Sequence, residues 1–179
     1  MRWSRRAVVQ ALTATLVVGG SAVAILRTRG YAVSKERKLV ALAAWQYVVV
    51  EHAARRIVAP DRPSDTTIPS ADDVEVAGFV DGWVFRLPRP VQRDLGRFLA
   101  FVEHMAPLGV GLGSRFTRLT PLQQDGVLSS IEGSSSDLVR AGFEGLRSLV
   151  FMGYYRDART WGIVSYDGPL VNRPAAGWR

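Results

Sequence analysis

The chain of 179 residues contains no cysteine. This absence excludes disulfide bonds, thiolate metal sites, covalently attached haem and cysteine nucleophiles together. Histidine is scarce as well: only His52 and His104 occur, each directly after a glutamate. Adjacent residues on a helix do not face each other and no HExxH pattern is present, so surface or capping histidines are a better interpretation than metal ligands.

Two further motifs do not indicate catalysis. The glycines at 109, 111 and 113 form a GxGxG pattern, but no strand precedes it and no nucleotide-binding fingerprint surrounds it, which favours a turn. The serines at 134–136 have no histidine near them in the sequence, and they indicate a helix start rather than a nucleophile. We therefore expect no catalytic, cofactor-binding or metal-binding residue in this chain.

Acidic residues are missing from the first 26 positions, and this region contributes much of the net charge of +7. Three of the charges come from Arg2, Arg5 and Arg6, while the remaining arginines are scattered among acidic residues. A modest and dispersed excess of this kind indicates a solvated surface. We therefore expect no nucleic-acid partner.

The N-terminal segment, residues 1–33, has the pattern of an export signal. A basic start with paired arginines precedes about twenty uncharged residues, as in a twin-arginine signal, and a small-x-small pattern follows as at a cleavage site. The residues that carry this prediction are Ser4, Arg5, Arg6, Ala22 and Ala24. The apolar run is also long enough for an uncleaved membrane anchor. Both alternatives place the folded part in the periplasm or cell envelope.

Beyond residue 33, apolar residues recur at spacings of three and four, and no stretch of useful length alternates as a β-strand does. We therefore expect an all-α fold, a bundle of about five helices over residues 34–161. Residues 162–179 have no helical period and contain several glycines and prolines. This composition predicts an extended, irregular C-terminal tail.

Capping residues mark the expected helix starts. The strongest start is Thr120, because Pro121 follows at the first helical position and Gln123 completes a capping box. A glycine-rich connection is expected over residues 107–113. The other expected starts are Ser34, Ser70, Pro90 and Ser136. Residues expected to face the core include Val76, Val80, Leu99, Met105, Leu122, Leu138, Phe143, Leu146 and Val150.

The end of the chain is rich in aromatic residues that carry a polar group. Such residues favour interfaces as well as cores, and arginine is enriched at interfaces too. The segment around them either folds back over the bundle or docks on another protein, and the residue types alone leave both alternatives open. The candidate interface residues are Met152, Tyr154, Tyr155, Arg156, Trp161, Tyr166, Asp167 and Pro169.

Several short motifs keep a common order in the C-terminal third of the chain. Residues 119–125 read Leu-Thr-Pro-x-Gln-x-Asp, residues 152–155 read Met-Gly-Tyr-Tyr, and Trp161 precedes Tyr-Asp-Gly-Pro at 166–169. In these motifs and in its N-terminus the chain resembles the gluconate 2-dehydrogenase subunit 3 family. This family comprises the small subunits of bacterial membrane-associated, flavin-dependent sugar and alcohol dehydrogenases.

The resemblance implies a noncatalytic partner of a large FAD-containing dehydrogenase of the glucose–methanol–choline type. It implies that this chain carries the export signal, aids maturation of the large subunit and crosses the membrane with it through the twin-arginine translocase. FAD then belongs to the partner, and a cytochrome subunit lies further along the electron path. The residues alone leave a second interpretation, a stand-alone exported or membrane-anchored helical protein that binds a small ligand.

Overall fold

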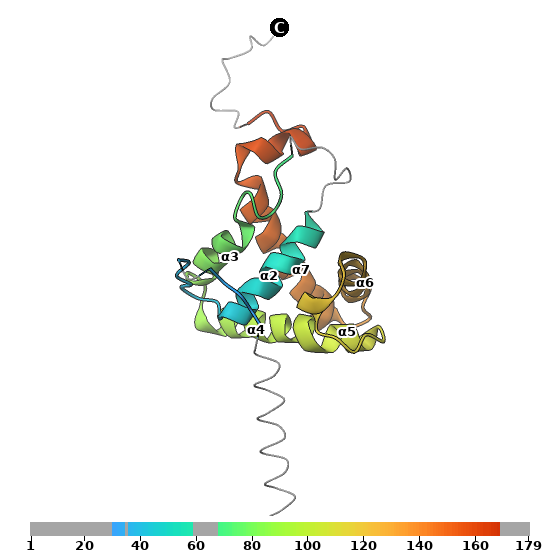
Figure 1. The fold of residues 1–179 in the computed structure, drawn as a ribbon. Coiled ribbons are helices and arrows are strands. Elements are labelled where there is room, and N and C mark those ends of the chain that lie inside the picture. Colours follow the sequence, from blue (N-terminus) through green and yellow to red (C-terminus); the bar gives the residue numbers. More distant parts are fainter. Residues whose placement is uncertain (1–29, 35, 59–67, 169–179) are drawn as a thin grey trace, which may run out of the picture. The chain divides into compact units, whose positions relative to one another are not determined.

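The computed structural model describes residues 30–34, 36–58 and 68–168 (Figure 1). The chain divides into two units, residues 1–32 and 33–179, and the described helices belong to the second. The predicted export-signal residues, Ser4, Arg5, Arg6, Ala22 and Ala24, lie outside the described residues, as does Pro169 in the tail.

Helices account for nearly all of the described secondary structure. They are α2 (Ala44–Ile57), α3 (Val76–Val84), α4 (Arg89–Ala100), α5 (Ala106–Gly109), α6 (Pro121–Glu132) and α7 (Asp137–Tyr155). Three shorter segments are the π-helix η1 (Phe101–Met105) and the 3-10 helices η2 (Phe116–Arg118) and η3 (Ala158–Val164). No strand occurs among the described residues, so the all-α prediction is confirmed. Within the same residues, none of the helices combines the length and the apolar character needed to span a membrane.

The core forms around α2, which contacts α3, α4, α6 and α7 (Figure 1). Val49, Val50 and Ala53 of α2 are completely buried, and so are Leu146 and Val150 of α7. Burying an aliphatic side chain of this size contributes roughly 1.5–3 kcal/mol, so this apolar contact is the main stabilising element of the bundle.

The first helix begins later than predicted. α2 starts at Ala44, whereas Ser34 closes only a single turn in which the Arg37 backbone N–H donates to the Ser34 carbonyl. Residues 36–43, which we call the strap, are not helical. The expectation of a helix start at Ser34 is therefore wrong.

A buried carboxylate on α3 explains the strap. Asp81 is almost completely buried. Its Oδ2 accepts the backbone N–H of Val40 at 2.8 Å, and its Oδ1 accepts those of Ala41 at 3.0 Å and Leu42 at 2.7 Å. Backbone donors that bind this carboxylate are unavailable for helical hydrogen bonds. The Ala43 N–H donates to the Gln46 side chain, and α2 begins at the next residue.

The second helix also starts later than predicted. Ser70 and Asp73 cap each other as expected, since the Asp73 N–H donates to the Ser70 hydroxyl and the Ser70 N–H to the Asp73 carboxylate. The turn then ends at Glu75, whose φ of 52° lies in the left-handed region. A left-handed residue interrupts a right-handed helix. α3 consequently begins at Val76, and the predicted start at Ser70 produces only a turn.

The third helix starts where predicted but continues further. α4 has Pro90 in its first turn, and η1 and α5 extend the helical run to Gly109. The expected connection over 107–113 is therefore helical in its first part. In η1 the Ala106 N–H bonds to the Phe101 carbonyl, so the wider π-turn comes directly before Pro107, which has no N–H to donate.

Three residues expected in the core are exposed instead. Met105, Leu122 and Leu138 have exposed fractions of 56%, 81% and 83%. Leu122 and Leu138 lie in the first turns of α6 and α7, beyond the contacts of the core. Met105 lies in the π-turn, which changes the register that the sequence spacing assumes.

Residues 119–125 attach α6 to α2. The Thr120 hydroxyl accepts the Gln123 N–H and the Gln123 side chain accepts the Thr120 N–H, as predicted for a capping box. Asp125, in the second turn, receives two hydrogen bonds from Arg56, at 2.6 and 2.8 Å. Paired arginine–carboxylate hydrogen bonds fix orientation as well as distance. The motif thus begins the helix and holds it in place.

A polar cluster lies inside the bundle between α2, η1, η2 and α6. Glu103 of η1 is completely buried and accepts hydrogen bonds from the backbone N–H and the hydroxyl of Thr117. Gln124 of α6 donates to the Phe116 carbonyl and bonds to Nδ1 of His52 at 2.9 Å. The other histidine, His104, lies against the ring of Trp45, with ring centroids 6.4 Å apart. The prediction of surface or capping histidines is therefore incomplete. His52 bonds to a side chain of α6, and His104 packs against the ring of Trp45.

We predict that stability falls on acidification partly through His52. Burial, followed by the nearby Arg55 charge, lowers the pKa of His52 below its ordinary value of 6.5. As the pH falls below 6.5, His52 therefore takes up a proton in the unfolded chain at a higher pH than in the folded chain. The free energy of unfolding decreases over this range until the pH lies below the pKa of His52 in the folded chain. The melting temperature between pH 7.5 and 5 should decrease less in His52→Gln than in the wild type. Equal decreases would contradict this role.

Gly153 permits the close approach of α7 to α3. A Cβ at this position would lie 2.9 Å from Phe79 and 3.2 Å from the buried Val76. Gly145, on the same helix, has no atom within 4 Å of the corresponding point. Alanine favours a helix by about 1 kcal/mol over glycine, whereas overpacking costs roughly 1–3 kcal/mol.

We therefore expect Gly145→Ala to raise the free energy of unfolding and Gly153→Ala to lower it relative to that control. The expected difference between the two variants is about 1–3 kcal/mol. Chemical denaturation of both variants measures it. Equal stabilisation by the two alanines would show that the α3–α7 contact adjusts without cost.

Candidate partner-binding surface

The last turns of α7 divide their aromatic residues between two environments. Tyr154 faces the core with an exposed fraction of 2%, and its hydroxyl donates to the Pro69 carbonyl at 2.7 Å. Phe151 is exposed, and Tyr155, four residues later, is half-buried with part of its side chain against the core; their ring centroids are 5.9 Å apart. Residues at this spacing are neighbours on a helix surface. The helix therefore presents aromatic side chains to solvent as well as to the core.

The polar residues that follow Tyr154 bind the turn before α3. Arg156 donates to the Val74 carbonyl at 3.0 Å, and its guanidinium lies over the ring of Phe79 at 5.3 Å. Arg159 donates to the Asp73 carbonyl at 3.3 Å. This part of the segment folds back on the bundle, one of the two alternatives that the sequence left open.

Asp157 orders the start of η3. Its carboxylate accepts the Arg159 backbone N–H at 2.9 Å and two further hydrogen bonds from the Arg159 side chain. These hydrogen bonds from Arg159 lower the pKa of Asp157 from 3.8 to about 2. The carboxylate therefore stays ionised across the physiological range, and the cap of η3 does not depend on pH there.

Trp161 organises the segment after α7. Its indole N–H donates to the Tyr155 carbonyl at 2.8 Å, and Tyr166 packs edge-on against it with ring centroids 5.1 Å apart. Gly168 completes this contact with a φ of +97°, a conformation that glycine adopts readily, and a Cβ there would lie 3.2 Å from the indole. Trp161 is half-buried, so one side packs on its own chain and the other remains accessible.

Around Trp161 several apolar side chains are not covered by the described residues. We name this set the C-terminal apolar surface: Phe151, Met152, Tyr155, Trp161, Ile163, Val164 and Tyr166. Five of them have exposed fractions between 37% and 52%, and Tyr155 and Trp161 are half-buried. Grouped apolar side chains on a surface are typical of a protein–protein contact. In Figure 1 this region, the end of α7 together with η3, lies at the far end of the bundle from α4 and α5.

A family model for gluconate 2-dehydrogenase subunit 3 matches residues 44–168. The chain belongs to this family. The match begins at the first residue of α2 and ends at Gly168, so it includes the bundle and the C-terminal apolar surface and leaves out the strap. No match was found among curated proteins or solved structures. The family name describes one subunit of a dehydrogenase, which implies partner subunits.

The family motifs contain most of the predicted interface residues. Met152, Tyr155, Trp161 and Tyr166 belong to the C-terminal apolar surface, whereas Tyr154 is a core residue. Arg156 and Asp167 are exposed, and Pro169 lies outside the described residues.

Sequence reasoning did not include Phe151, Ile163 and Val164 among the interface residues. Phe151 could have been found, because it precedes Tyr155 by four residues and therefore lies on the same side of α7. For Ile163 and Val164 no periodic signal exists, since they lie in a short 3-10 segment.

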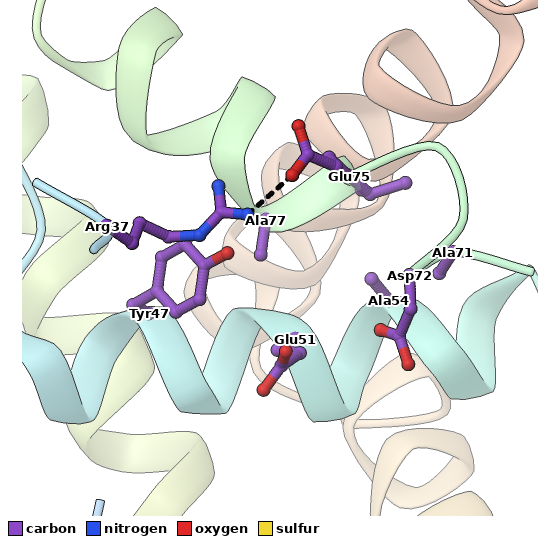
Figure 2. A pocket seen from close by; sticks show the side chains of 9 residues that line it. Arg37, Tyr47, Glu51, Ala54, Ala71, Asp72, Glu75 and Ala77 are labelled. Atoms are coloured by element: carbon purple, nitrogen blue, oxygen red, sulfur yellow. Dashed lines mark hydrogen bonds and ion pairs between the residues drawn. The ribbon is translucent and has the colours of Figure 1, made fainter. Parts of the chain in front are cut away.

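A small hollow lies between α2 and the turn before α3 (Figure 2), and its size bears on the alternative that the bundle binds a small ligand. Its volume is about 60 Å³, below the roughly 300–1,000 Å³ of typical ligand pockets. Arg37 crosses it above Tyr47 to reach Glu75 at 2.5 Å, and this hydrogen bond raises the pKa of Arg37. Two acidic residues that line it, Glu51 and Asp72, pair with Arg55. The charged side chains that line this hollow therefore have partners within the chain.

No group of three or more histidine, cysteine, aspartate or glutamate side chains in the described residues is arranged to bind a metal ion. The carboxylates with short contacts here bind arginines or backbone N–H groups instead. These carboxylates hold the elements of the bundle together through hydrogen bonds and ion pairs.

Proposed function

We propose that this protein is the noncatalytic small subunit of an exported FAD-dependent dehydrogenase and binds the large subunit through the C-terminal apolar surface. The observation that carries the proposal is the position of this surface, which contains residues of the family motifs and is left partly uncovered by the described residues of the chain. A lasting contact between subunits buries on the order of 2,000 Å² or more, with a few central aromatic and arginine residues dominating its energy. Trp161 and Tyr155 are suited to that central position.

The chemistry belongs to the partner in this proposal. The large subunit, of the glucose–methanol–choline type, binds FAD and oxidises a sugar or alcohol, and its electrons pass to a cytochrome subunit. This chain binds no cofactor and contributes by shaping and stabilising the large subunit during maturation. The resemblance of residues 1–33 to a twin-arginine signal supports a second role, in which the folded pair crosses the membrane together into the periplasm or cell envelope.

Co-expression with a candidate large subunit, a flavoprotein from a neighbouring reading frame, tests both roles. Flavin-linked dye reduction is measured in periplasm and cytoplasm, and the two chains are tested for copurification. The matched control is a full-length Arg5→Lys/Arg6→Lys variant, which keeps the charge of the N-terminus but not the paired arginines. We expect the wild-type chain to move active flavoprotein outward, and the lysine variant to bind it but leave it in the cytoplasm.

The outcomes separate the two roles. If the two chains copurify, and the wild type and the lysine variant export the flavoprotein equally, the subunit role stands and the twin-arginine route does not. A flavoprotein that is active and exported alone, and never copurifies with this chain, would overturn the proposed function.

A further inference from the structure

Arginines form a row along the outward side of α4. Arg89, Arg93 and Arg97 are spaced four residues apart, so they lie on one side of the helix, and all three are exposed. Leu95 and Leu99, which pack toward the core, are on the other side. At a rise of about 1.5 Å per residue the row is roughly 12 Å long. We call these three residues the arginine row.

The corner between α3 and α4 extends the row. Gln92 of α4 donates to the Leu87 carbonyl at 2.8 Å, which holds residues 85–87 against the first turn of the helix. Within this corner Arg86 is exposed and Phe85 has an exposed fraction of 60%. Val91, in the first turn of α4, is exposed as well. Positive charge and uncovered apolar side chains therefore occur together at this end of α4.

Acidic residues balance the row only in part. Arg97 pairs with Asp94 at 3.0 Å, and Arg89 bonds to the neutral side chain of Gln92. Over the described part of the chain, no ion pair is found for Arg86, Arg89 or Arg93. Other arginines differ: Arg140 pairs with Asp137, and Arg147 with both Glu132 and Glu144. Three of the four arginines at this end of α4 therefore have no acidic partner among the described residues.

The arginine row is separate from the C-terminal apolar surface. α4 meets α7 where the Phe98 ring lies against Gly142, near the start of α7. Tyr155 follows Gly142 by thirteen residues, which corresponds to roughly 20 Å along the helix. Figure 1 shows α4 and the end of α7 at different ends of the bundle. A partner on one surface therefore leaves the other free.

We propose that the arginine row, with Arg86 and Phe85, binds the surface of a membrane that contains anionic phospholipid. Guanidinium groups bind phosphate by paired hydrogen bonds, and aromatic side chains enter the interfacial layer. A helix side with charges in one line presents them together to a flat polyanionic surface. The export or anchor segment predicted at residues 1–33 would bring the chain to a membrane, so anionic lipid is the polyanion within reach. This inference does not depend on the identity of the large subunit.

The lack of cysteine allows a direct test on the full-length chain. Asp94→Cys places the only thiol beside the arginine row, and Asp94→Ser/Ser148→Cys, which loses the same charge, places it on the exposed side of α7 as a control. Each variant carries an environment-sensitive dye and is titrated with phosphatidylglycerol or phosphatidylcholine vesicles. We expect a spectral shift for the dye at 94 on phosphatidylglycerol and not on phosphatidylcholine. We expect no such difference for the dye at 148.

Charge-matched variants then measure the contribution of the row. In the Asp94→Cys background, Arg89→Gln/Arg93→Gln and Arg140→Gln/Arg147→Gln remove the same charge from different places. One arginine near an anionic surface changes binding about fivefold, so the first pair should raise the lipid concentration for half the shift roughly 25-fold. The second pair should change it far less.

Three results would overturn the proposal. One is an unchanged dye at 94 on phosphatidylglycerol, or an equal shift on phosphatidylcholine. Another is an equal loss with both charge-matched pairs. The third is a spectral shift of the dye at 94 that the purified large subunit causes without lipid and that lipid alone does not cause. That result would assign the arginine row to an acidic protein surface.

Discussion

Trp161→Ala is expected to weaken the complex with the large subunit by about 2 kcal/mol or more, which is roughly a 30-fold rise in Kd. The physical reason lies in the two sides of the indole. One side is already ordered by the Tyr155 carbonyl, Tyr166 and Gly168, so little rotational freedom remains to be lost on binding. The other side is available to a partner. A large, pre-ordered aromatic group of this kind is typical of an interface residue that dominates affinity.

The melting of the isolated subunit distinguishes an interface role from a packing role. Trp161 lies in η3 outside the buried core, so its removal should change the global free energy of unfolding less than removal of a core residue would. If Trp161 served only to pack the bundle, the lone subunit would lose roughly 3–5 kcal/mol. A large loss of stability together with unchanged affinity would contradict the interface role.

Trp83 on α3 supplies the matched control. It is also a partly exposed tryptophan, stacked on Phe79 with ring centroids 5.7 Å apart, but it does not belong to the C-terminal apolar surface. Trp83→Ala should leave affinity for the large subunit close to that of the wild type. Equilibrium binding of the two alanine variants, measured beside their thermal melting, gives the comparison. Equal weakening by both would show that the contact is not specific to the end of α7.

Asp81→Ala is expected to lower the free energy of unfolding by roughly 3 kcal/mol, because it removes one acceptor group from three backbone donors. The Val40, Ala41 and Leu42 N–H groups are directed at this carboxylate, and Leu42 is buried. A buried donor without a partner costs about 1–3 kcal/mol. The strap can lower this cost by detaching and exposing the donors to water, but it then loses the burial of Leu42.

Asp81→Asn is the graded control. Oδ1 accepts two of the hydrogen bonds and Oδ2 accepts one, so an amide oxygen in the place of Oδ1 keeps the two from Ala41 and Leu42 and loses the one from Val40. We expect a loss of about 1 kcal/mol or somewhat more.

Chemical denaturation measures the total effect of both Asp81 variants. Amide exchange at residues 40–42 shows whether the strap detaches on its own. Wild-type stability and unchanged exchange in Asp81→Ala would refute the role of this carboxylate.

Local signals were sufficient for much of the architecture. The capping box at Thr120 and the apolar spacing of α6 and α7 depend on residues within a few positions of each other, and these helices start where predicted. The all-α class follows from the same periodicity summed over the chain. Two of the family motifs have a structural role that explains them. Residues 119–125 cap α6, and Gly153 in residues 152–155 allows α7 to lie close to α3.

The first helix shows where local signals are insufficient. The spacing of Leu39 and Leu42 suits a helix from Ser34, but the backbone N–H groups of residues 40–42 are bound by Asp81, about forty residues later in the sequence. A hydrogen bond between distant residues has no periodic signature, so it overrides local propensity without warning. The same applies to Glu75, whose left-handed φ accompanies an ion pair with Arg37, and to Glu103, which lies buried opposite Thr117.

For the candidate surface, too, part could be predicted from the sequence and part was decided by the tertiary structure. From the sequence alone came the family, the aromatic content of the end of the chain and the expectation that it is used for a contact. Only the tertiary structure decided which side chains remain available, because burial depends on what packs against each face of α7. Tyr154 and Tyr155 are adjacent and chemically identical, yet one bonds to Pro69 inside the core and the other stays half-exposed beside Trp161. A helix turns about 100° between neighbouring residues, and the position of α3 determines which of the two is covered.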